Sequence, residues 1–181
     1  MRPKLQSNMD TKSIAEALGH KTKWTITKYA SDKDFSAGKS YEKVDIDGNL
    51  LVNEGINYLL TIIGTDAKTG TPWSNANANL IVGTGSGAAA AADVEGTFTA
   101  GVKVGMDTSF PTYGTSQKIT WQGTFTGLVA NQAWNEFGVL NAGSSGKLLN
   151  RKVSSQGTKN SGLMTILARI KSLLINGERL M

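Results

Sequence analysis

The sequence contains no cysteine, a single histidine and only three prolines among its 181 residues. Without cysteine, disulfides, thiolate metal sites and a cysteine nucleophile are excluded. His20 stands alone in a lysine-rich segment, so a histidine-rich metal site is excluded and a Ser-His-Asp triad would have to use this residue. The scarcity of proline argues against a collagen-like or proline-rich linker protein. We therefore expect no metal or other cofactor, and no small-molecule substrate.

Long apolar runs are also missing. No run approaches the roughly 20 residues that a transmembrane helix needs. Arg2 and Lys4 are not followed by the apolar segment of a secretory signal, so no membrane association is expected. A chain of this length suits one domain, or one domain with an arm.

Charge is distributed unevenly along the chain. Residues 1–43 carry nine Lys or Arg against five Asp or Glu, whereas residues 44–146 carry three against eight. Residues 147–181 carry seven against one, so two basic ends flank an acidic middle. This charge pattern is compatible with binding to nucleic acid or with head-to-tail contacts between copies of the protein. The basic residues form no block of five or six, so the sequence favours protein contact over nucleic acid.

The composition and pattern of the first 40 residues are typical of an extended N-terminal arm. They include a stretch, Thr11–Leu18, with the spacing of two helical turns, and an alternating stretch, Thr22–Tyr29. A polar, loop-like stretch follows over Ser31–Ser40. The segment is too poor in apolar residues to form its own core. One interpretation is a solvated, partly disordered terminus. We favour an arm in which residues 1–40 lie against another chain through the large apolar side chains that are costly to leave in water, which are Trp24, Ile26, Tyr29 and Phe35.

Residues 41–181 are expected to form a β-rich domain with one short helix. Val44–Leu51 is a short strand with a turn at Asp47-Gly48-Asn49. Asn53 is a candidate helix cap and Gly64 a candidate stop. The expected apolar face of this helix consists of Leu59, Leu60, Ile62 and Ile63.

Strand patterns dominate the remainder of the chain. Apolar and polar residues alternate most clearly over residues 118–126 (KITWQGTFT), which predicts a strand with one buried and one solvent-exposed face. Leu163–Ile175 fits a helix by its apolar spacing but also alternates as a strand would, so both readings stay open. Short strands with glycine-rich turns predict an antiparallel β-sandwich or barrel, jelly-roll-like in character. The other candidate strands are Asn79–Val82, Phe98–Met106, Ala133–Leu140 and Lys147–Val153.

Four side chains on neighbouring strands are predicted to form the core between sheets. Buried aromatic residues dominate such cores, and period-2 alternation places these positions inward. The predicted core residues are Trp121, Phe125, Trp134 and Val139.

A glycine-rich segment, Gly83–Ala88 (GTGSGA), imitates a dinucleotide-binding fingerprint. It follows a candidate strand, and Asp107 lies 24 residues after Gly83. The alanine run behind it meets Asp93 and Gly96 after barely two turns, too short for a crossover to a parallel strand. The favoured interpretation is a flexible surface loop whose small residues let two segments pass closely.

Acidic residues offer two candidate sites. Asp45 and Asp47 share one strand face, where a solvated face is favoured over a calcium loop because no glutamate follows at the required position. Glu136 lies in an apolar strand, where a carboxylate needs a partner. Arg151 and Lys152 on the next strand are candidates, and a structural ion pair is favoured over a catalytic acid.

Residues 76–161 resemble a group of small structural proteins of tailed bacteriophages. The residues that carry the resemblance are NANANLIVGTGSGAAAAA, GMDTSFP, KITWQGTF and ANQAWNEFGVLNAGSSGKLLNRKV with GTK after it. The preceding GNLLVNEGINYLLTIIGT resembles the helix found before this β-domain. The resemblance implies a β-rich, oligomeric virion component, assembled in the host cytoplasm, with no catalytic role.

Two functions follow from the resemblance. The first is a capsid cement or decoration protein on the outer capsid surface, which binds the major capsid protein and copies of itself. The second is a tail, collar or head-fibre component, such as an adaptor or a fibre base. A third hypothesis, a nucleotide-binding enzyme, is supported by the GTGSGA segment alone.

Overall fold

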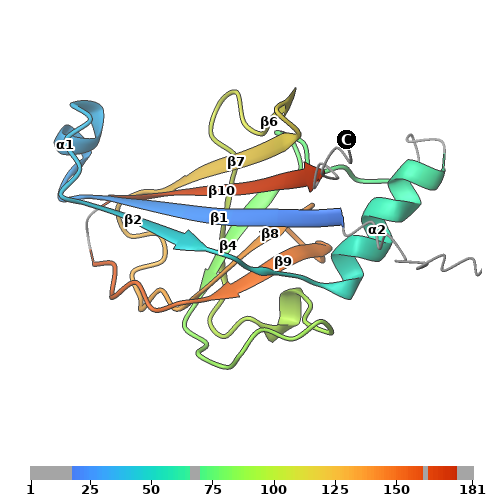
Figure 1. Ribbon diagram of the computed structural model, residues 1–181. Coiled ribbons are helices and arrows are strands. Elements are labelled where there is room, and N and C mark those ends of the chain that lie inside the picture. The colour runs from blue at the N-terminus through green and yellow to red at the C-terminus, as the bar shows by residue number, and fades with distance from the viewer. Residues whose placement is uncertain (1–17, 66–69, 161–162, 175–181) are drawn as a thin grey trace, which may run out of the picture.

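The computed structural model describes residues 18–65, 70–160 and 163–174 (Figure 1). Its helical elements are α1 (Asp32–Ser36), α2 (Asn53–Gly64) and a single 3₁₀ turn, η1 (Glu95–Thr97). Its strands are β1 (Leu18–Tyr29), β2 (Glu42–Asp47), β3 (Leu50–Leu51), β4 (Asn79–Gly83), β5 (Val102–Gly105), β6 (Thr112–Thr115), β7 (Lys118–Phe125), β8 (Glu136–Leu140), β9 (Leu148–Val153) and β10 (Leu163–Leu174).

The strands form two five-stranded antiparallel sheets that lie in two layers (Figure 1). Sheet A has the order β2-β1-β10-β7-β6, and sheet B has the order β3-β9-β8-β4-β5. The expected mainly-β, antiparallel class is confirmed. The stretch at 163–174, which the sequence left open between helix and strand, is the long strand β10.

The expected N-terminal arm is wrong from residue 18 onward. β1 lies inside sheet A and pairs with β10 over its full length, from Leu18 opposite Leu174 to Tyr29 opposite Leu163. Trp24 and Ile26 are fully buried in the core of their own chain, so they are not partner-binding residues. The boundary at residue 40 is therefore wrong as well, and residues 1–17 lie outside the described part of the chain.

Tyr29 and Phe35 lie at the corner between β1 and α1. Their rings meet edge to face, with centroids 5.1 Å apart, and Phe35 stays 39% exposed. A partner contact at these two residues stays a prediction. The polar stretch after residue 30 was expected to be a loop, but it begins with the short helix α1, which Ser31 caps by accepting a hydrogen bond from the backbone N–H of Asp34.

The four predicted core residues lie in one buried cluster between the sheets, as expected. Trp121 and Phe125 come from β7 of sheet A, and Val139 comes from β8 of sheet B. Trp134 precedes β8 and packs edge to face on Phe125, with ring centroids 4.9 Å apart. The alternation predicted for residues 118–126 therefore has the correct phase.

Candidate functional site: a buried ion cluster and an exposed apolar surface

Glu136 and Arg151 form the ion pair that the sequence predicted. Oε2 of Glu136 on β8 accepts hydrogen bonds from Nη2 and Nε of Arg151 on β9, at 2.6 and 3.0 Å. Asp93, which no sequence pattern marked as a partner, accepts a 2.8 Å hydrogen bond from Nη1 of the same guanidinium. All three side chains are buried. Burial alone lowers the pKa of Arg151, but hydrogen bonds and charge interactions with both carboxylates outweigh it and raise that pKa.

The glycine-rich segment wraps the Glu136 carboxylate. Oε1 of Glu136 accepts 2.8 Å bonds from the backbone N–H groups of Gly85 and Thr99. A Cβ atom added to Gly83 or Gly85 would lie 2.5 Å from this oxygen, so only glycine fits. β5, which follows, is antiparallel to β4, whereas a dinucleotide-binding unit requires a parallel strand. The close approach expected for GTGSGA is confirmed, but Gly83 belongs to β4 and Gly85 is bonded to a buried carboxylate, so the first part of this segment is not a flexible loop.

The ion cluster has the geometry of a structural device. Two carboxylates share one guanidinium, and backbone N–H groups of Gly85, Thr99 and Ala90 bind the carboxylate oxygens. Full pairing of this kind keeps charges stable in an apolar interior. The cluster connects β8, β9 and the loops on either side of η1.

Lys159 is another buried cation and, unlike Arg151 and Lys28, has no carboxylate partner among the described residues. Its Nζ donates to the backbone carbonyl of Gly127 at 2.6 Å and to Oδ1 of Asn131 at 2.7 Å. Desolvation by burial lowers the pKa of this ammonium group. The contacts fasten the loop between β7 and β8 to the segment that leads into β10.

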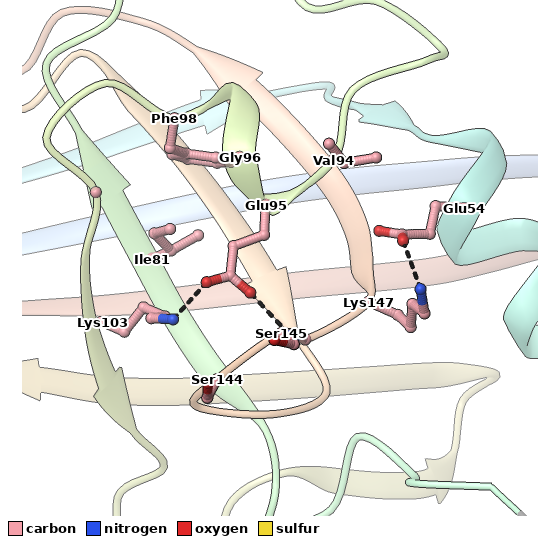
Figure 2. A pocket seen from close by; sticks show the side chains of 12 residues that line it. Glu54, Ile81, Val94, Glu95, Gly96, Phe98, Lys103, Ser144, Ser145 and Lys147 are labelled. Atoms are coloured by element: carbon pink, nitrogen blue, oxygen red, sulfur yellow. Dashed lines mark hydrogen bonds and ion pairs between the residues drawn. The ribbon is translucent and has the colours of Figure 1, made fainter.

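A polar pocket of about 600 Å³ lies beside η1 (Figure 2). Glu95 forms an ion pair with Lys103 and accepts a 2.8 Å bond from the backbone N–H of Gly146. Glu54 forms a 2.9 Å ion pair with Lys147 at the side of the pocket next to α2 (Figure 2). Each carboxylate therefore already has a lysine partner, and the pocket presents balanced charge.

Helix α2 packs on sheet B through one narrow face. A Cβ on Gly55 would lie 2.5 Å from Cα of Leu149, so the helix backbone sits directly against β9. Tyr58 meets Trp73 edge to face, and Ile62 packs on the core. Asn53 is the first helical residue and not the cap, since Val52 occupies the cap position without a side-chain bond.

The opposite face of α2 carries an exposed aliphatic stripe. Of the four residues expected to face inward, only Ile62 does so, and this expectation is otherwise wrong. Leu60 and Ile63 are 60% and 71% exposed. The spacing i, i+3, i+4, i+7 is that of one helix face. We call this surface the α2 stripe, and its members are Ile56, Leu59, Leu60 and Ile63.

An apolar groove of about 470 Å³ adjoins the α2 stripe. Leu59 belongs to both surfaces, and the exposed ring of Tyr113 on β6 forms part of the groove wall. The α2 stripe and the groove together form a continuous apolar surface. Monomeric proteins seldom expose large apolar surfaces of this kind, so it is a candidate contact site. Other lining residues are Ile62, Pro72, Trp73, Ile119 and Leu149.

The described residues include no group of three or more His, Cys, Asp or Glu side chains placed to hold a metal ion. Asp45 instead binds Nζ of Lys23 at 2.8 Å and Oγ1 of Thr25 at 2.6 Å, as a solvated strand face would. None of the helices in the described ranges combines the length and apolar character needed to cross a bilayer. In comparisons with protein-family models, curated proteins and solved structures, the chain matches none.

Proposed function

We propose that this protein is a virion structural protein of a tailed bacteriophage, a capsid cement that docks onto major capsid subunits and bridges neighbouring ones. The phage-like residues of the 76–161 stretch suggest the virion. The observation that carries the proposal is the α2 stripe with its adjoining groove. The proposal assigns no catalytic role and no cofactor.

The α2 stripe has the properties of a docking surface. Burying an exposed aliphatic side chain of this size stabilises a contact by roughly 1.5–3 kcal/mol at most. Because Gly55 places the helix backbone directly on β9, the stripe is held on a rigid support and little order has to be gained on binding. Leu60 and Ile63 are the most exposed members and supply the centre of the contact.

A cement protein works by repetition. Many copies on a shell act together, so each contact needs only modest affinity. The two-layered β-body supplies the rigid spacer between one capsid subunit and the next. The same stripe also fits the alternative, a tail, collar or head-fibre component, because an exposed apolar surface marks a contact site without identifying the partner.

Copy number separates the two candidates. A cement protein is expected in numbers comparable to the major capsid protein, whereas a collar or fibre component is expected in far fewer copies. The ratio of this protein to the major capsid protein in purified virions, measured by quantitative mass spectrometry, decides between them. Its complete absence from virions would overturn both.

The docking role of the stripe is tested with a polar double variant, Leu60→Gln with Ile63→Gln. Both positions are exposed and glutamine is a good helix former, so the variant is expected to fold normally. Particles lacking the protein are incubated with wild type or variant and separated by sedimentation. We expect at least about tenfold weaker binding for the variant, since two central apolar contacts are lost.

Leu128→Gln is the matched control. Leu128 is 84% exposed in the loop after β7, away from the stripe. It should bind particles like the wild type. Equal binding by all three proteins would show that α2 is not the docking surface.

A further inference from the structure

Three lysines lie in one row across the middle of sheet A. Lys171 of β10 is the register partner of Lys21 on β1 and of Lys118 on β7. Two residues further along, Arg169 of β10 lies opposite Lys23 of β1. Because strand positions alternate between faces, these five positions share one face of the sheet. One strand from each of the two basic parts of the sequence, β1 and β10, therefore pairs with the other in this sheet.

This face is the outer one, turned away from sheet B. Trp24 of β1 and Trp121 of β7 occupy the alternate positions and are buried in the core. Lys21 and Lys118 are exposed, and neither takes part in an ion pair with a described side chain. We call the five positions the basic rows.

The register of the basic rows places positively charged residues directly opposite one another on neighbouring strands. Directly opposite residues on neighbouring strands lie about 4.5–5.5 Å apart, and like charges there destabilise a sheet. Among the side chains that the structure describes, Lys23 is paired with Asp45 of β2. An external anionic group would stabilise the remainder.

β10 also carries apolar residues at its outer positions. Leu163, Leu167 and Leu173 share the phase of Arg169 and Lys171, whereas Ile166 and Ile170 have the inner phase. A strand that is apolar at both phases is typical of a sheet covered on both faces. The outer face of sheet A is therefore suited to a covering partner with apolar as well as anionic groups.

We propose that the outer face of sheet A docks onto a protein surface rich in carboxylates around an apolar centre. This chemistry favours protein over nucleic acid. Most outer positions of β1 and β7 that flank β10 carry threonine, glutamine or lysine, and the aromatic residue among them, Tyr29, already packs edge to face on Phe35. Asp45 and Asp47 on the neighbouring β2 would also repel a phosphate backbone. The proposal does not depend on the role of the α2 stripe.

The binding test uses fluorescent poly-L-glutamate as the carboxylate probe and a DNA duplex as the competing polyanion, at equal salt. The variant is Lys21→Glu with Lys118→Glu, and its control is Lys33→Glu with Lys39→Glu. Both control lysines are exposed near α1, at the far end of β1 from α2 (Figure 1), and both double variants change net charge equally. We expect roughly tenfold weaker polyglutamate binding for the first variant and a change within about twofold for the control. Equal losses in both variants, or tighter binding of the duplex than of polyglutamate, would overturn the proposal.

A stability measurement tests the repulsion itself. Lys171 is the register partner of both Lys21 and Lys118, so Lys171→Thr removes the charge common to these two pairs. Threonine is also a good strand former. Its melting temperature at low salt should exceed that of the wild type, and added salt should narrow the gap because it screens the lysines. Lys39→Thr should show neither effect. A Lys171→Thr protein that melts at or below the wild-type temperature at low salt would contradict the proposal.

Discussion

Oε2 of Glu136 lies 2.6 Å from Nη2 of Arg151, and both side chains are buried. The guanidinium extends from β9 to a carboxylate on β8 and, through Nη1, to Asp93 in a loop outside the sheet. The pair thus joins two strands to a loop that makes no ladder with either of them. The stability of this corner depends on the cation, because it is shared by two carboxylates.

Arg151→Met should be the most damaging change in the ion cluster. It leaves Glu136 and Asp93 buried without a cation, which costs roughly 3–5 kcal/mol of unfolding free energy. Glu136→Gln should cost clearly less, because Asp93 still neutralises the guanidinium. Urea denaturation of the two variants measures the order. Lys152→Met, at the neighbouring and more exposed position, is the control, and an Arg151→Met protein as stable as this control would contradict the cluster's structural role.

Gly85→Ala should destabilise the fold although it adds one methyl group. The new Cβ would lie 2.5 Å from Oε1 of Glu136, and this oxygen is held by two backbone N–H groups. We expect a loss of about 1–3 kcal/mol in denaturant titrations. Gly87→Ala in the same loop meets nothing within 4 Å and should change stability by less than about 0.5 kcal/mol. Equal effects would show that the loop moves freely around the carboxylate.

The sequence predicted local features well because their signals are local. Alternation over residues 118–126 identified β7 and its inward Trp121, and a carboxylate between apolar neighbours identified Glu136 as a paired group. Asp93 had no such signal. It lies 58 residues from Arg151, and nothing in its neighbourhood points to a guanidinium.

The N-terminal arm was mispredicted because its partner, like that of Asp93, is distant in the sequence. The alternation of TKWTITKY is a strand pattern, but its partner β10 lies at the opposite end of the chain. When the pairing strand is far away in the sequence, no neighbouring segment indicates that a strand pattern belongs to a sheet. Helix α2 shows a related limit: its aliphatic residues extend around the helix, and Gly55 selects the face that packs. That selection depends on the position of β9.

Trp121→Ala should remove a large part of the stability between the sheets. The side chain is buried in the common core, and its Nε1 donates a 3.2 Å bond to the backbone carbonyl of Trp73. A loss of roughly 3–5 kcal/mol is expected, as is typical of aromatic-to-alanine changes in cores. Tyr113→Ala, an exposed aromatic on β6, should cost less than about 0.5 kcal/mol. Thermal and urea unfolding of the two variants provides the comparison.

Lys159 should make the protein more stable as pH rises through the alkaline range. Burial lowers the pKa of Lys159 in the folded state, so the unfolded chain binds this proton more tightly. The free energy of unfolding therefore rises with pH from the folded pKa up to the ordinary value of 10.5. Urea midpoints measured at several pH values in this window should show a rise for wild type that Lys159→Met lacks. Lys152→Met should keep the rise, and a Lys159→Met protein with the wild-type pH profile would contradict the assignment.

Gly55→Ala should loosen α2 and thereby weaken the contact proposed for its stripe. The added Cβ would lie within 2.5–2.7 Å of backbone atoms of Leu148 and Leu149, which cannot move without disturbing β9. We expect a loss of about 1–3 kcal/mol in stability together with reduced particle binding at temperatures where the variant remains folded. Gly64→Ala at the end of the same helix meets nothing within 4 Å and should be neutral or stabilising, since alanine is the better helix former. Hydrogen exchange of α2 amides distinguishes the two, with faster exchange only in Gly55→Ala. If that variant exchanges faster yet binds particles at full strength, the orientation of α2 on β9 does not govern docking, and the stripe is not presented as a rigid surface.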